Sequence, residues 1–206
     1  MRVAEALRAV GADPTRAELL IEHARAVWRS ADRLGLVSDR SLGRILSRHT
    51  LDSLGFASAR RPGPGERWAD VGSGAGFPGL VLAVAFPETD FVLVESQQRR
   101  AGFLELQLLD LGASNARVFA RRLQELPEDQ SGFDVVTARA FSSSEGSGSS
   151  PAAFGLLSTI AKPPHGVVLI AAGETAETPD PDSATREVRV LPPAVDYPTR
   201  YLMMHV

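Results

Sequence analysis

The chain contains no cysteine, which excludes disulfide frameworks, thiolate zinc sites and cysteine nucleophiles. Its four histidines never take a metal-ligand spacing such as H-x-x-x-H, so metal catalysis is not indicated: His23, His49, His165 and His205. No apolar run approaches the roughly 20 residues that span a bilayer, and the first residues carry no signal-peptide pattern. We therefore expect a soluble, cytoplasmic protein with no metal and no membrane partner.

Lysine is almost absent, because Arg supplies all but one of the 22 basic residues. The formal net charge of -3 argues against a strongly basic nucleic-acid binder, but the charge is uneven. Residues 1–62 hold 11 Arg against 7 acidic side chains, a net of +4, which leaves -7 for the remainder. This pattern indicates either an electropositive N-terminal surface or an ordinary solvated helical face.

The N-terminal part has a helical pattern. Apolar residues recur near a period of 3.6 and predict one buried stripe: Ala17, Leu19, Leu20, Ile21, Ala24, Val27 and Trp28. A second helix is expected from Ser41 through Leu46. Pro and Gly in residues 60–65 break any helix, so we predict a helical extension over residues 1–62 and a main domain over residues 63–206.

Beyond this boundary, strands and helices alternate. We expect strands at 67–71, 91–94, 116–119, 133–137 and 166–171, helices at 78–86 and 99–111, and a last strand at 200–206. Such repeats predict an α/β fold with a mainly parallel sheet and helices on both faces. The Ser/Gly run 142–150 is expected to be mobile, and 174–182 to be an acidic loop.

Three glycines follow the first of these strands and precede a helix: Gly72, Gly74 and Gly76. Residues without a Cβ let the backbone turn tightly and approach a ligand, which is typical of nucleotide-binding loops. The residues from Gly74 to Gly79 also satisfy the G-x-G-x-x-G pattern of NAD enzymes. Asp70, two residues before the first glycine, and the early start of the loop favour S-adenosylmethionine, with the acid near its positive amino group.

Glu95 ends the next strand, 23 positions beyond Gly72. A carboxylate there can accept hydrogen bonds from both ribose hydroxyls of a nucleoside, each contributing about 1.5–3 kcal/mol when well made. Either cofactor would use Glu95 in this way. It therefore supports nucleoside binding without deciding between the two.

The sequence resembles the bacterial methyltransferases that modify N7 of one guanosine in small-subunit (16S) ribosomal RNA. The resemblance spans about residues 15–172 and rests on Arg48-His49-Thr-Leu-Asp52-Ser53-Leu54, on residues 70–79, on Arg122 and on Thr137-Ala-Arg139-Ala-Phe141. It implies a Rossmann-like class I fold, S-adenosylmethionine as cofactor, and 16S rRNA or the small ribosomal subunit as partner.

The resemblance also implies roles for individual residues. Gly72 and Phe77 would line the cofactor beside Asp70, Gly74 and Glu95, and Leu123 and Gln124 match the pair that flanks the adenine, where the family usually has Ala-Glu. Arg139 would contact the cofactor or the target base and, with Arg122 and His49 near the cleft, make up the predicted catalytic set. Two alternatives stay open: Arg122 pairs with Glu125, and His49 is a structural histidine.

The region after Arg139 departs from the family. The Ser/Gly run replaces a helix, Lys162 to Gly166 lacks the usual glycine pair, and Ala172-Gly173 stands where Lys-Gly is typical. A divergent paralogue with another acceptor or none is therefore the alternative, and an NAD-dependent oxidoreductase a third. Guanine N7 carries an unprotonated lone pair, so its methylation needs positioning and electrostatics rather than a general base, with Phe77 or Phe141 stacking on the base.

Overall fold

The computed structural model describes residues 2–39, 41–139, 142–143, 146–147, 151–172, 185–190 and 199–206. Its main feature is a seven-stranded sheet in the order β3-β2-β1-β4-β7-β9-β8. The strands are β1 (Arg67–Val71), β2 (Asp90–Val94), β3 (Ala116–Phe119), β4 (Val135–Arg139), β7 (Val167–Ala172), β8 (Thr185–Val190) and β9 (Thr199–His205). From β3 to β7 all pairs are parallel, and β9 and β8 complete the sheet with antiparallel pairs.

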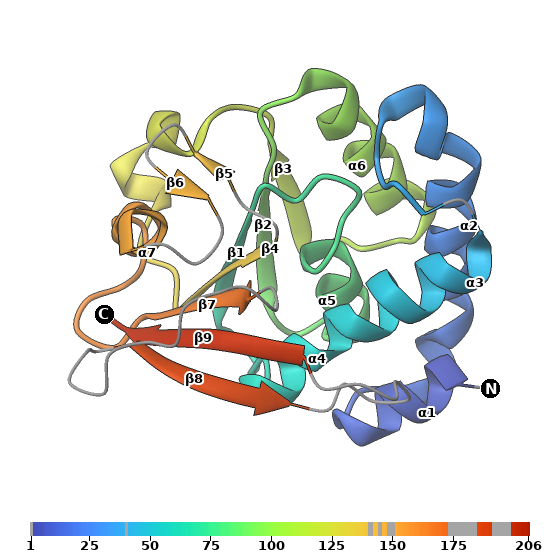
Figure 1. The fold of residues 1–206 in the computed structure, drawn as a ribbon, viewed down its shortest axis with the longest axis horizontal. Helices are drawn as coiled ribbons and strands as arrows, with labels where there is room; N and C mark the ends of the chain where they lie inside the picture. Colours follow the sequence, from blue (N-terminus) through green and yellow to red (C-terminus); the bar gives the residue numbers. More distant parts are fainter. Residues whose placement is uncertain are drawn as a thin grey trace.

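Helices cover both faces of this sheet (Figure 1). They are α1 (Arg2–Ala9), α2 (Ala17–Leu34), α3 (Leu42–Ile45), α4 (Leu51–Ala59), α5 (Gly79–Ala85), α6 (Gln98–Asp110) and α7 (Pro151–Ser158). Short 3-10 turns lie at η1 (Pro14–Arg16), η3 (Leu123–Glu125) and η4 (Glu128–Gln130), and η2 (Leu46–Thr50) is a π-helical turn.

Two hydrophobic cores lie on the two faces of the sheet. Side chains alternate along each strand, so Trp68 of β1 packs into the core shared with α1, α2, α4, α5 and α6. Its neighbour Ala69 packs into the second core, where Phe154 and Leu157 of α7 cover the sheet. The predicted α/β fold, mainly parallel with helices on both faces, is confirmed.

The N-terminal helices share the first core with the rest of the chain. Leu20, Val27 and Leu54 are fully buried in the same cluster as Leu80 and Leu82 of α5. The division of the chain at residues 62 and 63 stays a prediction.

One part of the predicted helical stripe is wrong. Trp28 is 49% exposed, whereas the buried positions of α2 are Leu20, His23, Ala24, Val27 and Ala31. Trp28 follows Val27 by one residue, which turns it about 100° away from the stripe.

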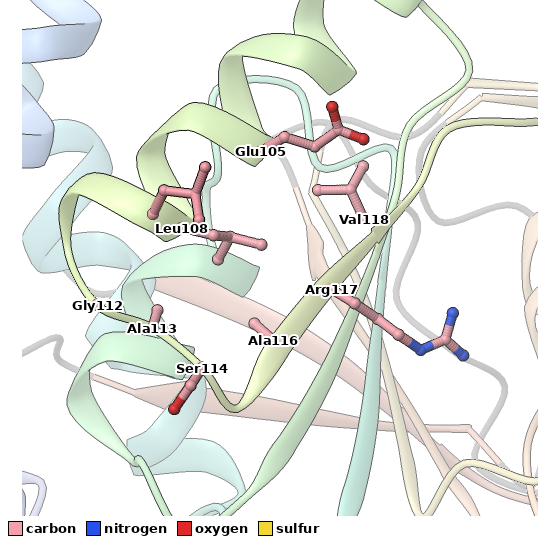
Figure 2. A pocket seen from close by; sticks show the side chains of 9 residues that line it. Glu105, Leu108, Gly112, Ala113, Ser114, Ala116, Arg117 and Val118 are labelled. Atoms are coloured by element: carbon pink, nitrogen blue, oxygen red, sulfur yellow. The ribbon is translucent and has the colours of Figure 1, made fainter.

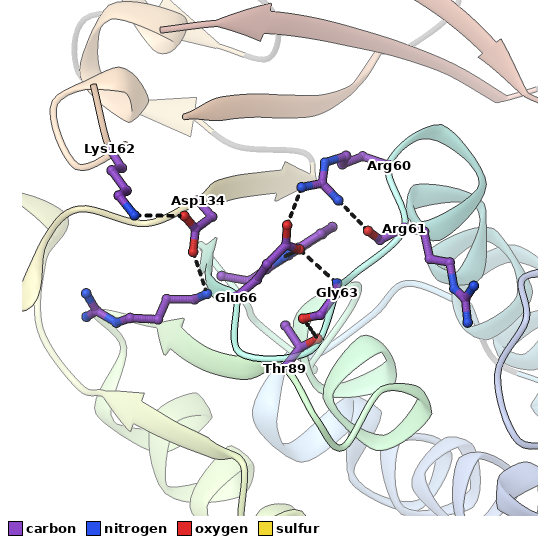
Figure 3. A network of polar contacts seen from close by, with 9 residues as sticks. Arg60, Arg61, Gly63, Glu66, Thr89, Asp134 and Lys162 are labelled. Carbon is purple, nitrogen blue, oxygen red and sulfur yellow. Dashed lines mark hydrogen bonds and ion pairs between the residues drawn. The ribbon is translucent and has the colours of Figure 1, made fainter. Parts of the chain in front are cut away.

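A polar network closes the end of the sheet opposite to the glycine loop (Figure 3). Glu66 accepts hydrogen bonds from the Gly63 N–H at 2.8 Å and from Trp68 Nε1 at 3.1 Å, and it pairs with Arg60. Asp134 accepts the Arg67 N–H at 2.9 Å. The Pro/Gly segment after α4 is thus held against the first strand.

The C-terminal part differs most from expectation. The structure adds α7 and β8, which the sequence did not indicate, and β4 starts two residues later than expected. Residues 142–143 and 146–147, within the Ser/Gly run, pair as the short antiparallel strands β5 (Ser142–Ser143) and β6 (Gly146–Ser147). The predicted last strand is present as β9, whereas the predicted loop 174–182 lies outside the described residues.

Within the described ranges, no helix combines the length and the apolar character that a membrane crossing requires.

Candidate functional site

The glycine loop leaves β1 at the carboxyl edge of the parallel sheet, where open α/β sheets bind their ligands. Gly72, Gly74 and Gly76 have φ of 75°, 56° and 94°, conformations that favour glycine. The Gly72 N–H donates to the Val94 carbonyl at 2.9 Å, and the Gly76 N–H donates to the Ser73 carbonyl at 2.7 Å. The loop is thus a compact turn held beside the end of β2.

Glu95 lies directly after β2 and is only 5% exposed. Its Oε2 accepts the Gly74 N–H at 2.9 Å and its Oε1 accepts the Gln97 N–H at 2.7 Å. The carboxylate therefore joins the glycine loop to the loop after β2. Because each carboxylate oxygen has two lone pairs, acceptor capacity is left for a ligand.

Asp70 is more deeply buried than a ligand-facing acid, at 1% exposure. Its Oδ2 accepts the Gly79 N–H at 3.0 Å and its Oδ1 accepts the Thr137 hydroxyl at 3.0 Å. Burial raises the pKa of Asp70 to about 6, against the hydrogen bonds of Ser73, Thr137 and Gly79. In this geometry Asp70 holds the start of α5 behind the glycine loop.

Phe77 lies among histidines. Its ring stacks on His49 with 5.2 Å between centroids and an interplanar angle of 28°, and it tilts against His23 at 5.2 Å. It is only 7% exposed. The side chain therefore offers little surface on which a flipped base could stack, and Phe141, the other stacking residue expected, lies outside the described residues.

Arg139 and His49 meet beside β4. Arg139 Nη2 donates to the Arg48 carbonyl at 2.7 Å and lies 3.5 Å from Asp52 Oδ2. His49 Nε2 lies 2.8 Å from Asp39 Oδ2. Burial and the Arg139 guanidinium lower the pKa of His49, although Asp39 opposes this shift.

The π-helical turn η2 explains this meeting, because it contains both Arg48 and His49. Single π turns inside helices often occur at functional sites. The Arg48 carbonyl is the acceptor for Arg139.

The remaining predicted residues lie after β3, three positions away from β4 in the sheet. Leu123 is 6% exposed, whereas Arg122 and Gln124 are exposed. The Arg122 backbone N–H donates to Glu125 Oε1 at 3.2 Å, and the ion pair to Glu125 comes from Arg121, at 3.5 Å.

Four residues near the loop were missed at the sequence level: His23, Asp39, Gly79 and Thr137. A Cβ on Gly79 would lie 2.5 Å from Asp70 Cβ. Thr137 could have been found from the strand pairing alone, because it lies opposite Asp70 in the parallel β1–β4 ladder. The others depend on helix packing, which the sequence does not reveal.

A separate hollow of about 430 Å³ lies between α6 and β3 (Figure 2). It is lined mainly by apolar side chains such as Leu108, Ala116 and Val118. None of the predicted site residues lines it. Across the described ranges no cluster of three or more His, Cys, Asp or Glu could hold a metal.

Solved structures with the same fold include methyltransferases. A SAM-dependent methyltransferase from Aquifex aeolicus superposes with a TM-score of 0.58 at 19% identity, over 85% of this chain and 98% of that one. A complex of MtNAS with S-adenosylmethionine gives 0.59 at 18% identity, over 91% and 72%. At these identities the likeness concerns the fold, and it confirms the Rossmann-like class I architecture.

Sequence comparison is more specific. Proteins named Ribosomal RNA small subunit methyltransferase G include one from Clavibacter michiganensis subsp. michiganensis, 39% identical over 127 residues, which are 62% of this chain and 58% of that protein. Another, from Stutzerimonas stutzeri, is 40% identical over 121 residues, 57% and 53% of the two chains. The chain thus spans little more than half the length of these relatives. The model of the family described as rRNA small subunit methyltransferase G (GidB) matches residues 16–152, so this chain belongs to that family.

Proposed function

We propose that this protein is an S-adenosylmethionine-dependent methyltransferase that modifies N7 of a guanosine in 16S ribosomal RNA. Family membership supports the reaction and the RNA partner. The observation in the structure that carries the proposal is the bond from the Gly74 N–H to Glu95, at 2.9 Å. It places a buried carboxylate with spare acceptor capacity beside a bare backbone turn, which suits a nucleoside.

The chain offers a chemically fitting set of groups for this cofactor. Glu95 would accept ribose hydroxyls, and the backbone of Gly72 and Gly74 would allow close approach. Leu123, buried after β3, would lie against the adenine, with Gln124 beside it. When bound, S-adenosylmethionine supplies a methyl group on a positively charged sulfur.

Asp70 would act on the cofactor through the loop. Both of its oxygens already accept hydrogen bonds from the protein, from Gly79 and Thr137. Its role would be to fix the first turn of α5 and with it the path of the loop. Replacement of Asp70 should therefore weaken cofactor binding and lower stability together.

The chemistry requires orientation of the base rather than proton transfer from it. His49 is kept neutral by its lowered pKa and lies within hydrogen-bond distance of Asp39, so it suits a packing role beside Phe77. Arg139 Nη1 is buried without a hydrogen-bond partner among the described residues, and it would be a donor for the target base or the cofactor. Such a donor contributes positioning and electrostatic stabilisation.

Binding of RNA would use arginines that the protein leaves exposed. Arg99 and Arg122 are exposed on segments that follow β2 and β3. Arg60 pairs with Glu66, and Arg61 donates to the Gly11 carbonyl at 2.7 Å, so these two arginines are already engaged. Charge reversal at Arg122 should reduce the salt dependence of RNA affinity more than reversal at Arg61.

The direct test is methyl transfer from labelled S-adenosylmethionine to small ribosomal subunits and to deproteinised 16S RNA. We expect 7-methylguanosine in nucleoside mass spectra, at one position, and no product with Glu95→Gln. Calorimetry with NAD as the competing ligand checks the cofactor. Binding of S-adenosylmethionine without transfer to either substrate would favour the paralogue alternative, and binding of NAD instead would refute the proposal.

A further inference from the structure

A histidine from the N-terminal extension is buried behind the glycine loop. His23 belongs to α2 and is fully buried. Its Nδ1 lies 3.2 Å from Gln107 Oε1 of α6, and the ring of Phe103, also from α6, lies 6.3 Å away. The imidazole is therefore fixed by α6 on one side.

Its other side contacts the loop itself. A Cβ on Gly76 would lie 3.2 Å from His23 Nε2, so the ring is packed against bare backbone. The next residue, Phe77, has its ring 5.2 Å from the imidazole. His23 is thus wedged between α6 and the last turn of the loop before α5.

The ring is neutral in this position. Burial lowers the pKa of His23 to about 4, although Gln107 and the Ala75 carbonyl favour the protonated form. Nε2 makes no hydrogen bond to any described residue. A buried polar nitrogen of this kind costs stability, which argues that the ring is not there for stability alone.

We propose that His23 is a positioning residue for the glycine loop, so that α2 forms part of the cofactor site without touching the ligand. Gln107 sets the orientation of the ring, and the ring sets the path of the backbone at Gly76 and Phe77. The identity of the ligand rests on the proposed function, whereas the effect on the loop does not.

The test compares three variants of the full chain. His23→Asn keeps an amide that can bond to Gln107 but removes the ring from the loop. Val27→Ala removes buried volume one turn further along α2, at a residue that is also fully buried, and serves as the matched control for lost packing. The double variant His23→Phe with Gln107→Leu keeps a ring and replaces both polar partners, which is close to neutral for stability.

The first measurement is amide hydrogen exchange of residues 73–81 without ligand, and the second is the Kd for S-adenosylmethionine. We expect His23→Asn to speed exchange of this segment and to weaken binding about tenfold. Val27→Ala should change neither, and the double variant should stay within about threefold of the wild type in both.

Equal effects of His23→Asn and Val27→Ala on the loop would overturn the proposal, since they would reflect general loosening. If His23→Asn does not fold, the double variant decides: wild-type loop exchange supports the proposal, and faster loop exchange in a protein of normal stability refutes it. Failure of the wild type to bind S-adenosylmethionine would refute the proposed function alone, because the exchange comparison needs no ligand.

Discussion

Gly79 and Gly102 are both helical glycines, yet the structure predicts opposite effects of changing them to alanine. A Cβ on Gly79 would lie 2.5 Å from Leu93 Cδ2 and 2.6 Å from Asp70 Oδ2. Leu93 is fully buried and Asp70 nearly so, so neither can move aside. A Cβ on Gly102, in α6, would meet no heavy atom within 4 Å.

The magnitudes follow from these surroundings. Overpacking a core costs about 1–3 kcal/mol. Displacement of α5 would also break the bond from the Gly79 N–H to Asp70, and loss of a hydrogen bond to a charged group costs about 1.5–3 kcal/mol. We therefore expect Gly79→Ala to lower the free energy of unfolding by about 3–5 kcal/mol. Gly102→Ala should raise it by about 0.5–1 kcal/mol through helix propensity.

Urea unfolding followed by far-ultraviolet circular dichroism measures both changes under the same conditions. S-adenosylmethionine affinity should fall with Gly79→Ala and stay unchanged with Gly102→Ala. A Gly79→Ala protein as stable as the wild type would show that the contact of α5 with β1 is looser than described. A destabilised Gly102→Ala protein would contradict the open space at α6.

Three further predictions rest on single groups. Glu95→Gln should weaken cofactor binding and cost about 1–3 kcal/mol of stability, because its amide NH₂ must face the N–H of Gly74 or Gln97; calorimetry and urea unfolding test this, and unchanged stability would contradict it. Since the folded-state pKa of His23 lies below its unfolded value, its contribution to stability is present above pH 6.5 and is lost as pH falls toward 4, a loss of about 2 kcal/mol between pH 7 and pH 5 that should be absent from the His23→Phe double variant. Tyr201→Phe should lower stability by about 1 kcal/mol, because it removes a buried hydrogen bond from β9 to α4, and a thermal melt with no shift would refute the bond.

The carboxyl-edge half of the fold was readable because local chemistry and tertiary role coincide there. Glycine is the residue that turns with positive φ, so Gly72, Gly74 and Gly76 marked the loop before any contact was known. The strand ending before Glu95 was equally clear, since a continuous apolar run indicates a strand buried on both faces.

The C-terminal half was less readable. The segment 185–190 alternates charged and apolar residues and forms the last strand of the sheet, paired on one side only, so no apolar run distinguished it. The helix at 151–158 follows a Ser/Gly run and has no polar capping box to announce it.

By itself, the sequence determined the order of strands and helices, the position of the glycine loop and the acid that follows β2, because these depend on neighbours along the chain. Tertiary structure alone decided that Asp70 faces α5, that His49 meets Arg139 beside β4, and that His23 packs against the loop from α2. These relations join residues up to 91 positions apart, as in the bond from Arg139 to the Arg48 carbonyl. Periodicity reports which face of a helix is buried, but the partner that it meets is set only when the helices pack.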